Sequence, residues 1–193
     1  MRIRDYQEKD ENGWIRCRVL AFLNTAYHDN VLQKKEKYEY PAIELVAEID
    51  NLIVGILDIE VEDNPGQVCS NSETRSGMIW HIAIHPDYQR SGIAASLLKE
   101  AEQRLHKQGV HRLEAWTRDD KWVNDWYEKH GFSKGKSYLH VYLEGKEHEE
   151  IVESKLPDLK PIYTFAHYTG DQQEEIKAKY QRVHECNMYE KHL

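Results

Sequence analysis

The residues best suited to chemistry lie in one stretch, where an apolar run ends in a turn and a helical pattern begins. Residues 81–94 read His-Ile-Ala-Ile-His-Pro-Asp-Tyr-Gln-Arg-Ser-Gly-Ile-Ala. The first turn of a helix has backbone N–H groups without an intrahelical partner, and the helix dipole is positive there. Gly92 lets the main chain approach a ligand without a Cβ in the way, and Arg90 adds a positive charge. This stretch therefore predicts an anion site whose geometry suits a pyrophosphate.

Strand and helix patterns alternate along the chain, which predicts an α/β (α+β) fold with a mixed sheet. Residues 43–49 and 52–60 are alternating apolar segments on either side of Asp50-Asn51, a hairpin signal. Five further segments have strand character: 1–6, 78–84, 112–117, 132–143 (with a break near Gly135) and 161–168. Helical spacing of apolar residues predicts helices over 11–27, 31–40, 92–108, 120–131 and 171–189.

Composition excludes several classes of protein. The 193 residues fit one domain of ordinary size, and the formal charge of −8 disfavours binding to nucleic acid or to an anionic membrane. The chain has no apolar run of 18 residues, and its charged start does not resemble a signal peptide. Its three cysteines are far apart, which favours a reducing cytoplasm, and the histidines lack metal-site spacing. We therefore expect a cytoplasmic protein with no metal site.

Two motifs resemble one known family. Gln89-Arg90-Ser91-Gly92-Ile93-Ala94 resembles the Gln/Arg-x-x-Gly-x-Gly/Ala signature of the GNAT superfamily of N-acetyltransferases. Residues 126–132, Trp-Tyr-Glu-Lys-His-Gly-Phe, resemble the Tyr-Glu-Lys-x-Gly-Phe ending of the next helix in that family. The resemblance covers about residues 1–143. It implies a mostly antiparallel, twisted central sheet of six to seven strands, flanked by helices and with splayed central strands. Residues 144–193 are then an extension (loop, final strand and helix) packed on the same domain.

The resemblance implies acetyl-CoA as co-substrate. In such proteins the backbone N–H groups of the turn hold the pyrophosphate, and the free edge of the preceding strand pairs with the pantetheine arm. The residues that this assigns to the cofactor are Ile82, Ala83, Ile84, Gln89, Arg90, Ser91, Gly92, Ile93 and Ala94. Ala95 departs from the Ser or Thr that the family often has there. The family's cofactor-contacting Asn aligns with Asp120; Asn124, one helical turn later, is the candidate for this contact, and the alternative is a place on the helix surface.

The resemblance also implies a catalytic acid. Tyr127, four residues before Gly131, matches the family's general acid. A tyrosine has a pKa of about 10 and a thiol about 8.5, so a tyrosine stays protonated at neutral pH and donates to a leaving thiolate. The alternative reading of Tyr127 is an aromatic residue of the core.

The catalytic base is less defined. An alkyl amine is almost entirely protonated at pH 7, so some group must remove a proton before it attacks. The family's Glu or His positions align with Met78 and Trp80, which are not bases. His81, which strand alternation turns to the other sheet face, and Glu60 are the alternatives, beside a chain of water molecules.

The leading hypothesis is an N-acetyltransferase that moves acetyl from acetyl-CoA to a primary amine of a small molecule by direct attack in a ternary complex. Neither motif contains a cysteine for a covalent route. The alternative is a non-catalytic acyl-CoA sensor, or an interaction module in which residues 144–193 form a homodimer. The acceptor is chosen by residues 11–40, 61–77 and the tail, and Trp80 and Trp116 are candidates for lining its pocket.

Overall fold

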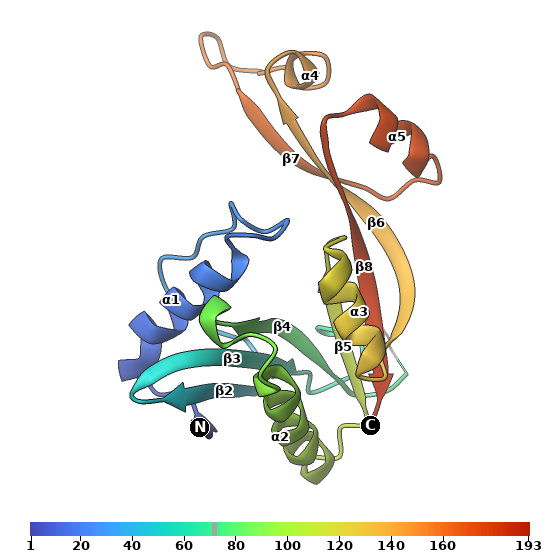
Figure 1. Cartoon of the computed structure of the whole chain (residues 1–193). Helices are drawn as coiled ribbons and strands as arrows, with labels where there is room; N and C mark the ends of the chain where they lie inside the picture. Colours follow the sequence, from blue (N-terminus) through green and yellow to red (C-terminus); the bar gives the residue numbers. More distant parts are fainter. Residues whose placement is uncertain (71–72) are drawn as a thin grey trace.

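A computed structural model describes residues 1–70 and 73–193. Its eight strands form one sheet in the order β1-β2-β3-β4-β5-β8-β6-β7, antiparallel except for the parallel pair β4 and β5 (Figure 1). The strands are β1 (Arg2–Asp5), β2 (Ala42–Ile49), β3 (Leu52–Val61), β4 (Ser76–Ile84), β5 (Arg112–Thr117), β6 (Ser133–Glu144), β7 (Tyr163–Tyr168) and β8 (Arg182–His192). The helices are α1 (Glu11–Phe22), α2 (Ile93–Lys107), α3 (Lys121–Lys129), α4 (Gly145–Glu149) and α5 (Gln173–Lys179), with short 3₁₀ turns at Glu8–Asp10 and Pro86–Tyr88. This is the expected mixed sheet, with eight strands instead of six or seven.

Two apolar layers hold the body of the molecule together. One cluster packs α2 and α3 onto the sheet, and a smaller one packs α1 onto the opposite face (Figure 1). β3 is buried along nearly its whole length because helices cover both of its faces, which explains its almost continuous apolar sequence. The hairpin between β2 and β3 turns at Asp50 and Asn51, both with positive φ, as a two-residue hairpin requires.

The central parallel pair comes apart, as expected. β4 pairs with β5 only from Ser76 to Ile79, and beyond that point β5 continues with β8 alone. On its other side β4 stays paired with β3, where the register shifts so that Trp80 is an extra residue. Such a bulge bends a strand. The backbone groups of residues 80–84 that face β5 therefore have no partner strand.

One predicted helix is wrong, and another is shorter than predicted. Residues 31–40 form no helix; the segment crosses the α1 side of the sheet instead, where Lys35 is buried against Asp58. An ion pair with the sheet outweighs the weak local preference of a charged run that has no apolar face. The first helix ends at Phe22 and not at residue 27, because Thr25 and Ala26 enter turns.

The predicted C-terminal helix 171–189 is also wrong in most of its length. Only Gln173–Lys179 is helical, and Arg182–His192 is the strand β8. β8 lies between β5 and β6, so a segment after residue 143 completes the sheet of the residues before it. Val183 and Ile176 lie in one small apolar cluster. Their apolar spacing therefore does mark a packed face, but the two residues belong to β8 and α5 and not to one helix. The predicted break near Gly135 is confirmed as a register shift between Lys134 and Ser137.

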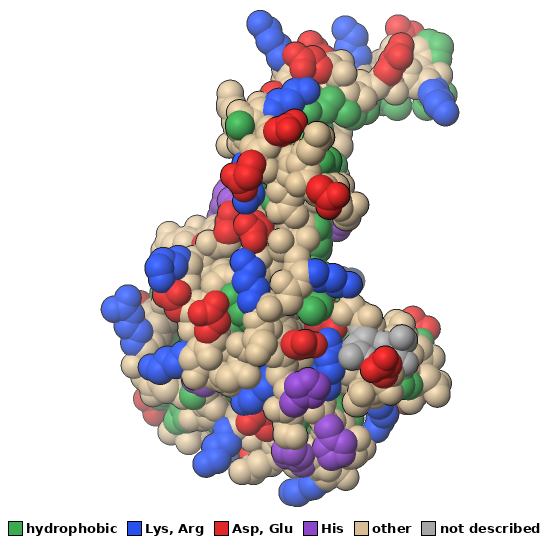
Figure 2. Space-filling model, turned by 90° about the vertical axis from the view of Figure 1, so that its right-hand side faces the viewer, with side chains coloured by type: hydrophobic (Ala, Val, Ile, Leu, Met, Phe, Trp, Pro, Cys, Tyr) green, Lys and Arg blue, Asp and Glu red, His purple; other side chains and the backbone are tan. Residues whose placement is uncertain are grey.

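The far halves of β6 and β8, together with β7, α4 and α5, project from the body as an arm (Figure 1). Figure 2 shows this arm as a narrow column above a rounded body, with charged side chains of both signs along it. β7 is the edge strand of the sheet, and its Tyr163 and Phe165 are exposed. No helix among the described residues is long and apolar enough to cross a membrane.

Candidate active site

The turn 89–94 joins β4 to α2 and has the backbone shape that its sequence predicts. Gly92 is the N-cap residue of α2 with φ +81°, and Arg90 also has positive φ at 59°. A Cβ built on Gly92 would meet no atom within 4 Å, so this side of the turn is open. The glycine is therefore required by backbone conformation and not by crowding.

The N–H groups of this turn are available for a ligand. Among the described residues, no acceptor receives a hydrogen bond from the backbone N–H groups of residues 90–95, whereas Gln89 N–H donates to Pro86 O at 3.3 Å. Consecutive free N–H groups at a helix N-terminus form an anion-binding site. The residues fit a pyrophosphate, although the free groups begin one residue later than the sequence interpretation placed them.

The exposed edge of β4 begins where the strand leaves β5. Ile82 and Ile84 point into the α2 side of the core, and Ala83 packs on the α1 side. Ile84 O accepts a hydrogen bond from Gln89 Nε2 at 3.2 Å, which ties the end of the strand to the turn. This edge is suited to backbone pairing with an extended ligand arm, as predicted for residues 82–84.

Tyr127 lies on α3 with its ring in the core. The ring stacks on Tyr189 of β8 at 5.2 Å and meets Phe132 edge-on at 5.1 Å. It belongs to the same apolar cluster as Ile82, Ile84 and Ala115. The hydroxyl has no hydrogen-bond partner among the described residues, and burial raises the pKa of Tyr127. A protonated hydroxyl without a partner, beside the parting strands, is the arrangement that a proton donor needs.

His81 faces α1, as strand alternation predicts. Arg18 Nε donates to its Nδ1 at 3.3 Å, and its Nε2 lies in a short contact with Glu36. An arginine only donates, so Nδ1 is the acceptor nitrogen and Nε2 carries the hydrogen. The lone pair that a base would use is therefore occupied by Arg18. The catalytic role of His81 stays a prediction, which requires this contact to open.

Glu60 also has its oxygens engaged. Its Oε1 accepts from the backbone N–H groups of Glu39 and Tyr40 at 2.8 and 2.9 Å, and its Oε2 accepts from Trp80 Nε1 at 2.7 Å. Hydrogen bonds to a carboxylate stabilise its charged form and weaken it as a base. In this structure Glu60 holds the segment 36–40 and the Trp80 ring in position; its role as base stays a prediction.

Asn124 is fully hydrogen-bonded within the protein. Its amide donates to Arg118 O and Asp120 O at 2.7 and 2.9 Å, and its carbonyl accepts from Asn187 and Tyr189. These contacts fix α3 against β8. A cofactor contact through Asn124, still a prediction, would have to replace one of them. The Asp120 carboxylate accepts from Ala26 N–H.

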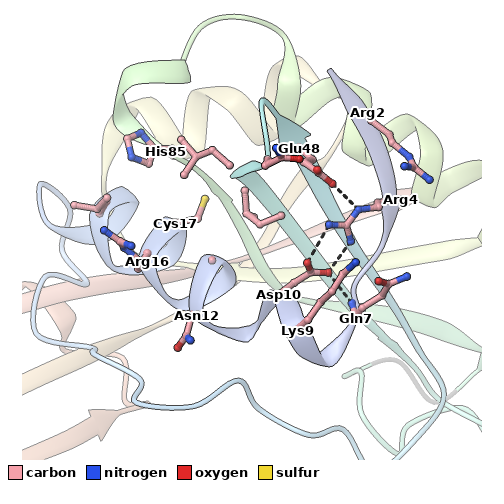
Figure 3. Close-up of a pocket in the computed structure, with 15 residues that line it drawn as sticks. Arg2, Arg4, Gln7, Lys9, Asp10, Asn12, Arg16, Cys17, Glu48 and His85 are labelled. Atoms are coloured by element: carbon pink, nitrogen blue, oxygen red, sulfur yellow. Dashed lines mark hydrogen bonds and ion pairs between the residues drawn. The ribbon is translucent and has the colours of Figure 1, made fainter.

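One hollow lies at the start of α1. It has a volume of about 650 Å³ and is formed by β1, α1 and the β2–β3 turn, with His85 at one side (Figure 3). Arg4 in its wall donates to Asp10 and to Glu48, so these charges neutralise one another. The remaining cations, Arg2, Lys9 and Arg16, are exposed.

A second pocket of about 490 Å³ lies beside the bulge of β4 and brings together residues that the sequence analysis named separately. We call it the second pocket; its lining residues are Glu36, Lys37, Tyr38, Glu39, Tyr40, Glu60, Gln67, Val68 and Trp80. Trp80 was predicted to line such a pocket. Trp116, the other candidate, instead donates to Glu114 at 2.9 Å and packs on Tyr138. The segments 11–40 and 61–77, which are predicted to choose the acceptor, contain seven of the other lining residues, although the helix predicted over 31–40 does not form.

A buried ion pair supports the wall of the second pocket. Lys35 Nζ lies 2.9 Å from Asp58 Oδ2, which also accepts from the Tyr38 hydroxyl at 2.9 Å. Asp58 is completely buried, and burial raises the pKa of its carboxyl group. The sequence signal for this pair was Asp58 itself, an acidic residue inside an otherwise apolar strand. No group of three His, Cys, Asp or Glu in the described part of the chain is arranged to hold a metal.

Comparisons with known proteins agree with this geometry. An acetyltransferase of Yersinia pestis (strain Pestoides F) is 28% identical over 124 residues, which cover 62% of this chain and 78% of that protein. A GNAT family acetyltransferase of Streptococcus pneumoniae superposes with a TM-score of 0.60 at 16% identity, covering 100% of this chain and 99% of the other. One from Elizabethkingia anophelis, solved with acetyl-CoA bound, gives 0.54 at 14% identity, covering 100% and 97%. At such identities the structural likeness shows the fold alone, and that fold is the one of acetyltransferases.

A comparison with protein-family models gives a family match as well as the fold. The family model described as "Acetyltransferase (GNAT) domain" matches residues 42–134, which contain β2 to β5, the turn 89–94 and α3. The family match, the sequence relative and the fold agree. Residues 42–134 therefore match a GNAT acetyltransferase domain, and the chain as a whole has the fold of such acetyltransferases.

Proposed function

We propose that this protein transfers the acetyl group of acetyl-CoA to a primary amine of a small molecule. The observation that carries the proposal is the pairing of free N–H groups on residues 90–95 with the unpaired edge of β4. The first suits a diphosphate and the second an amide-bearing arm, and CoA has both. The Elizabethkingia structure, with acetyl-CoA bound in the same fold, supports the choice of co-substrate.

The proposed mechanism assigns each step of the transfer to particular groups of the protein. The amine nitrogen attacks the thioester carbonyl carbon, and the N–H groups of β4 near Ile82 stabilise the oxygen as it gains charge. The carbon–sulfur bond then breaks. The sulfur takes the proton of the Tyr127 hydroxyl, which burial keeps protonated by raising its pKa. The proton lost by the amine leaves through water, since Glu60 and His81 are engaged in hydrogen bonds.

A direct test is a thiol-release screen with acetyl-CoA and a panel of amines, aminoglycosides and peptides. We expect release of free CoA that depends on an amine and that gives an N-acetylated product by mass spectrometry. If acetyl-CoA binds by calorimetry and no amine releases CoA, the protein is the alternative, a non-catalytic acyl-CoA sensor. If acetyl-CoA does not bind, both readings fail.

We also propose a homodimer formed through the arm. The edge strand β7, Tyr-Thr-Phe-Ala-His-Tyr, has no acidic or basic side chain apart from His167, and Ile162 beside it is 81% exposed. Antiparallel pairing of β7 with its own copy brings no charges of one sign together. The mass in solution is expected to be that of a dimer and to halve in Phe165→Glu; a monomeric wild-type protein would contradict this. We place the reaction in the cytoplasm because the three cysteines are unpaired.

A further inference from the structure

The second pocket has a charge pattern that the proposed transfer reaction does not itself require. Its lining residues include three glutamates, Glu36, Glu39 and Glu60, and one lysine, Lys37. The Glu36 carboxylate stays charged because its hydrogen bond with His81 lowers its pKa. Glu39 is exposed, and its carboxylate has no hydrogen bond or ion pair with another described residue. The pocket is therefore negative and keeps one carboxylate free for a ligand.

The pocket also presents an aromatic face. Trp80 is 48% exposed, although large aromatic side chains are usually buried. The hydrogen bond from its Nε1 to Glu60 fixes the ring at the pocket wall, where Tyr40 is also placed. The face of an indole attracts a cation, and nearby carboxylates add to that attraction. A fixed, exposed indole among carboxylates is suited to an aliphatic ammonium group.

The position of this pocket relates it to the acyl-transfer site. Trp80 directly follows Ile79, the last β4 residue that pairs with β5. The pocket thus borders the point at which the strands part, while the turn 89–94 lies beyond the other end of the open edge. A molecule seated there has one end near the parting strands. Its volume of about 490 Å³ is within the range of small-molecule sites, roughly 300–1,000 Å³.

We propose that the second pocket holds a second positive charge of the acceptor, so that the preferred substrate is an aliphatic amine with a further ammonium group several bonds away. This inference rests on the proposed function. Glu39 and the face of Trp80 bind the distant ammonium group, and the near amine, once deprotonated, attacks the thioester. One N–C bond forms, one C–S bond breaks, and the far ammonium group keeps its proton throughout.

The test compares 1,5-diaminopentane with pentylamine, which has the same carbon chain and lacks the second charge. We expect kcat/KM for the diamine to exceed that for the monoamine by about tenfold, because only the diamine can pair with the Glu39 carboxylate and also place an ammonium group on the face of Trp80. In Glu39→Gln the ratio is expected to fall by about three- to tenfold through the KM of the diamine. Glu149→Gln, which removes the same charge from an exposed site on the arm, is the control and is expected to keep the wild-type ratio.

The outcomes separate the two proposals. If both amines are acetylated with similar kcat/KM, or if Glu39→Gln and Glu149→Gln behave alike, the charge assignment is wrong and the acetyltransferase proposal stands. If neither amine nor any other is acetylated, the proposed function fails, and calorimetry with CoA-bound protein decides the inference. Tighter binding of the diamine than of pentylamine, reduced in Glu39→Gln, supports it; equal binding overturns it.

Discussion

The turn 89–94 and the second pocket lie at opposite ends of the same open edge of β4 and are built on different principles. The turn is local: it spans six consecutive residues, and its binding groups belong to the main chain. The second pocket is assembled from the segment 36–40, one residue each of β3 and β4, and Gln67 and Val68. Its binding groups are side chains.

This difference determines where changes of side chain are tolerated. Main-chain N–H groups are present whatever the side chain, so the turn needs only a backbone that takes the left-handed conformation at Gly92. The second pocket depends on the identity of Glu39, Glu60 and Trp80. A superfamily with one co-substrate and many acceptors is expected to keep the first kind of site and change the second.

The largest expected effect falls between the two regions, at Tyr127. Tyr127→Phe removes a hydroxyl that has no partner among the described residues, so the fold loses no hydrogen bond while the leaving sulfur loses its proton donor. We expect kcat to fall by about 100-fold, in the usual range for a general acid, with little change in the melting temperature. Tyr189→Phe, in the stacked neighbouring ring, loses a hydrogen bond to Asn124 and so shows the effect of loosening α3 while the Tyr127 hydroxyl is kept. An unchanged kcat in Tyr127→Phe would remove this residue from the mechanism.

The next largest effect is expected from a change in the turn 89–94. In Gly92→Ala a side chain is forced into a left-handed backbone with φ +81°, at a cost of about 1–2 kcal/mol. If the turn changes its conformation to avoid this strain, the affinity for acetyl-CoA is expected to fall roughly tenfold. Calorimetry should show this loss with the KM of the acceptor unchanged. Gly109→Ala is a matched control, because Gly109 has φ +70° and equally open surroundings at the other end of α2. Equal acetyl-CoA affinity in both variants would place the diphosphate elsewhere.

A smaller effect is expected from the pocket side. Glu60→Gln cannot accept all three hydrogen bonds that hold Glu39, Tyr40 and Trp80. We expect the acceptor KM to rise by about three- to tenfold and the free energy of unfolding to fall by about 1–3 kcal/mol, with acetyl-CoA affinity retained. Urea unfolding, steady-state kinetics and calorimetry measure the three quantities. If kcat falls by orders of magnitude with KM unchanged, Glu60 is the base and not a positioning residue.

The smallest expected effect is the absence of a decline on the alkaline side of the pH profile. Burial raises the pKa of Tyr127, so the acid stays protonated above its ordinary value of 10.0. The rate should rise with pH as the amine deprotonates and should not decline below about pH 10. Steady-state rates between pH 7 and 9.5 test this. A decline in that range which Tyr127→Phe abolishes would show that the pKa of Tyr127 is lowered instead.

Local sequence patterns predicted most of the helices and strands in the body of the molecule. The hairpin at Asp50 and Asn51, the strand before the turn, and helices ending at Gly109 and Gly131 follow from short-range rules that tertiary contacts here reinforce. The helix predicted over 171–189 is wrong over most of its length because apolar spacing does not distinguish a short helix followed by a strand from one long helix. Residues 182–192 are a strand because β5 and β6 both offer them a free edge. Such pairing lies far away in sequence, where local propensity carries no information.

By itself the sequence determined the turn 89–94, the tyrosine of α3 and the family to which both point. Those features depend on neighbours in the chain, whose distances covalent geometry limits. Only the tertiary structure decided that Glu60 and His81 are held by other side chains, and that segment 36–40 meets Trp80 in a pocket. These contacts join residues 20 and 45 positions apart, and they form only when the folded sheet brings the segments together.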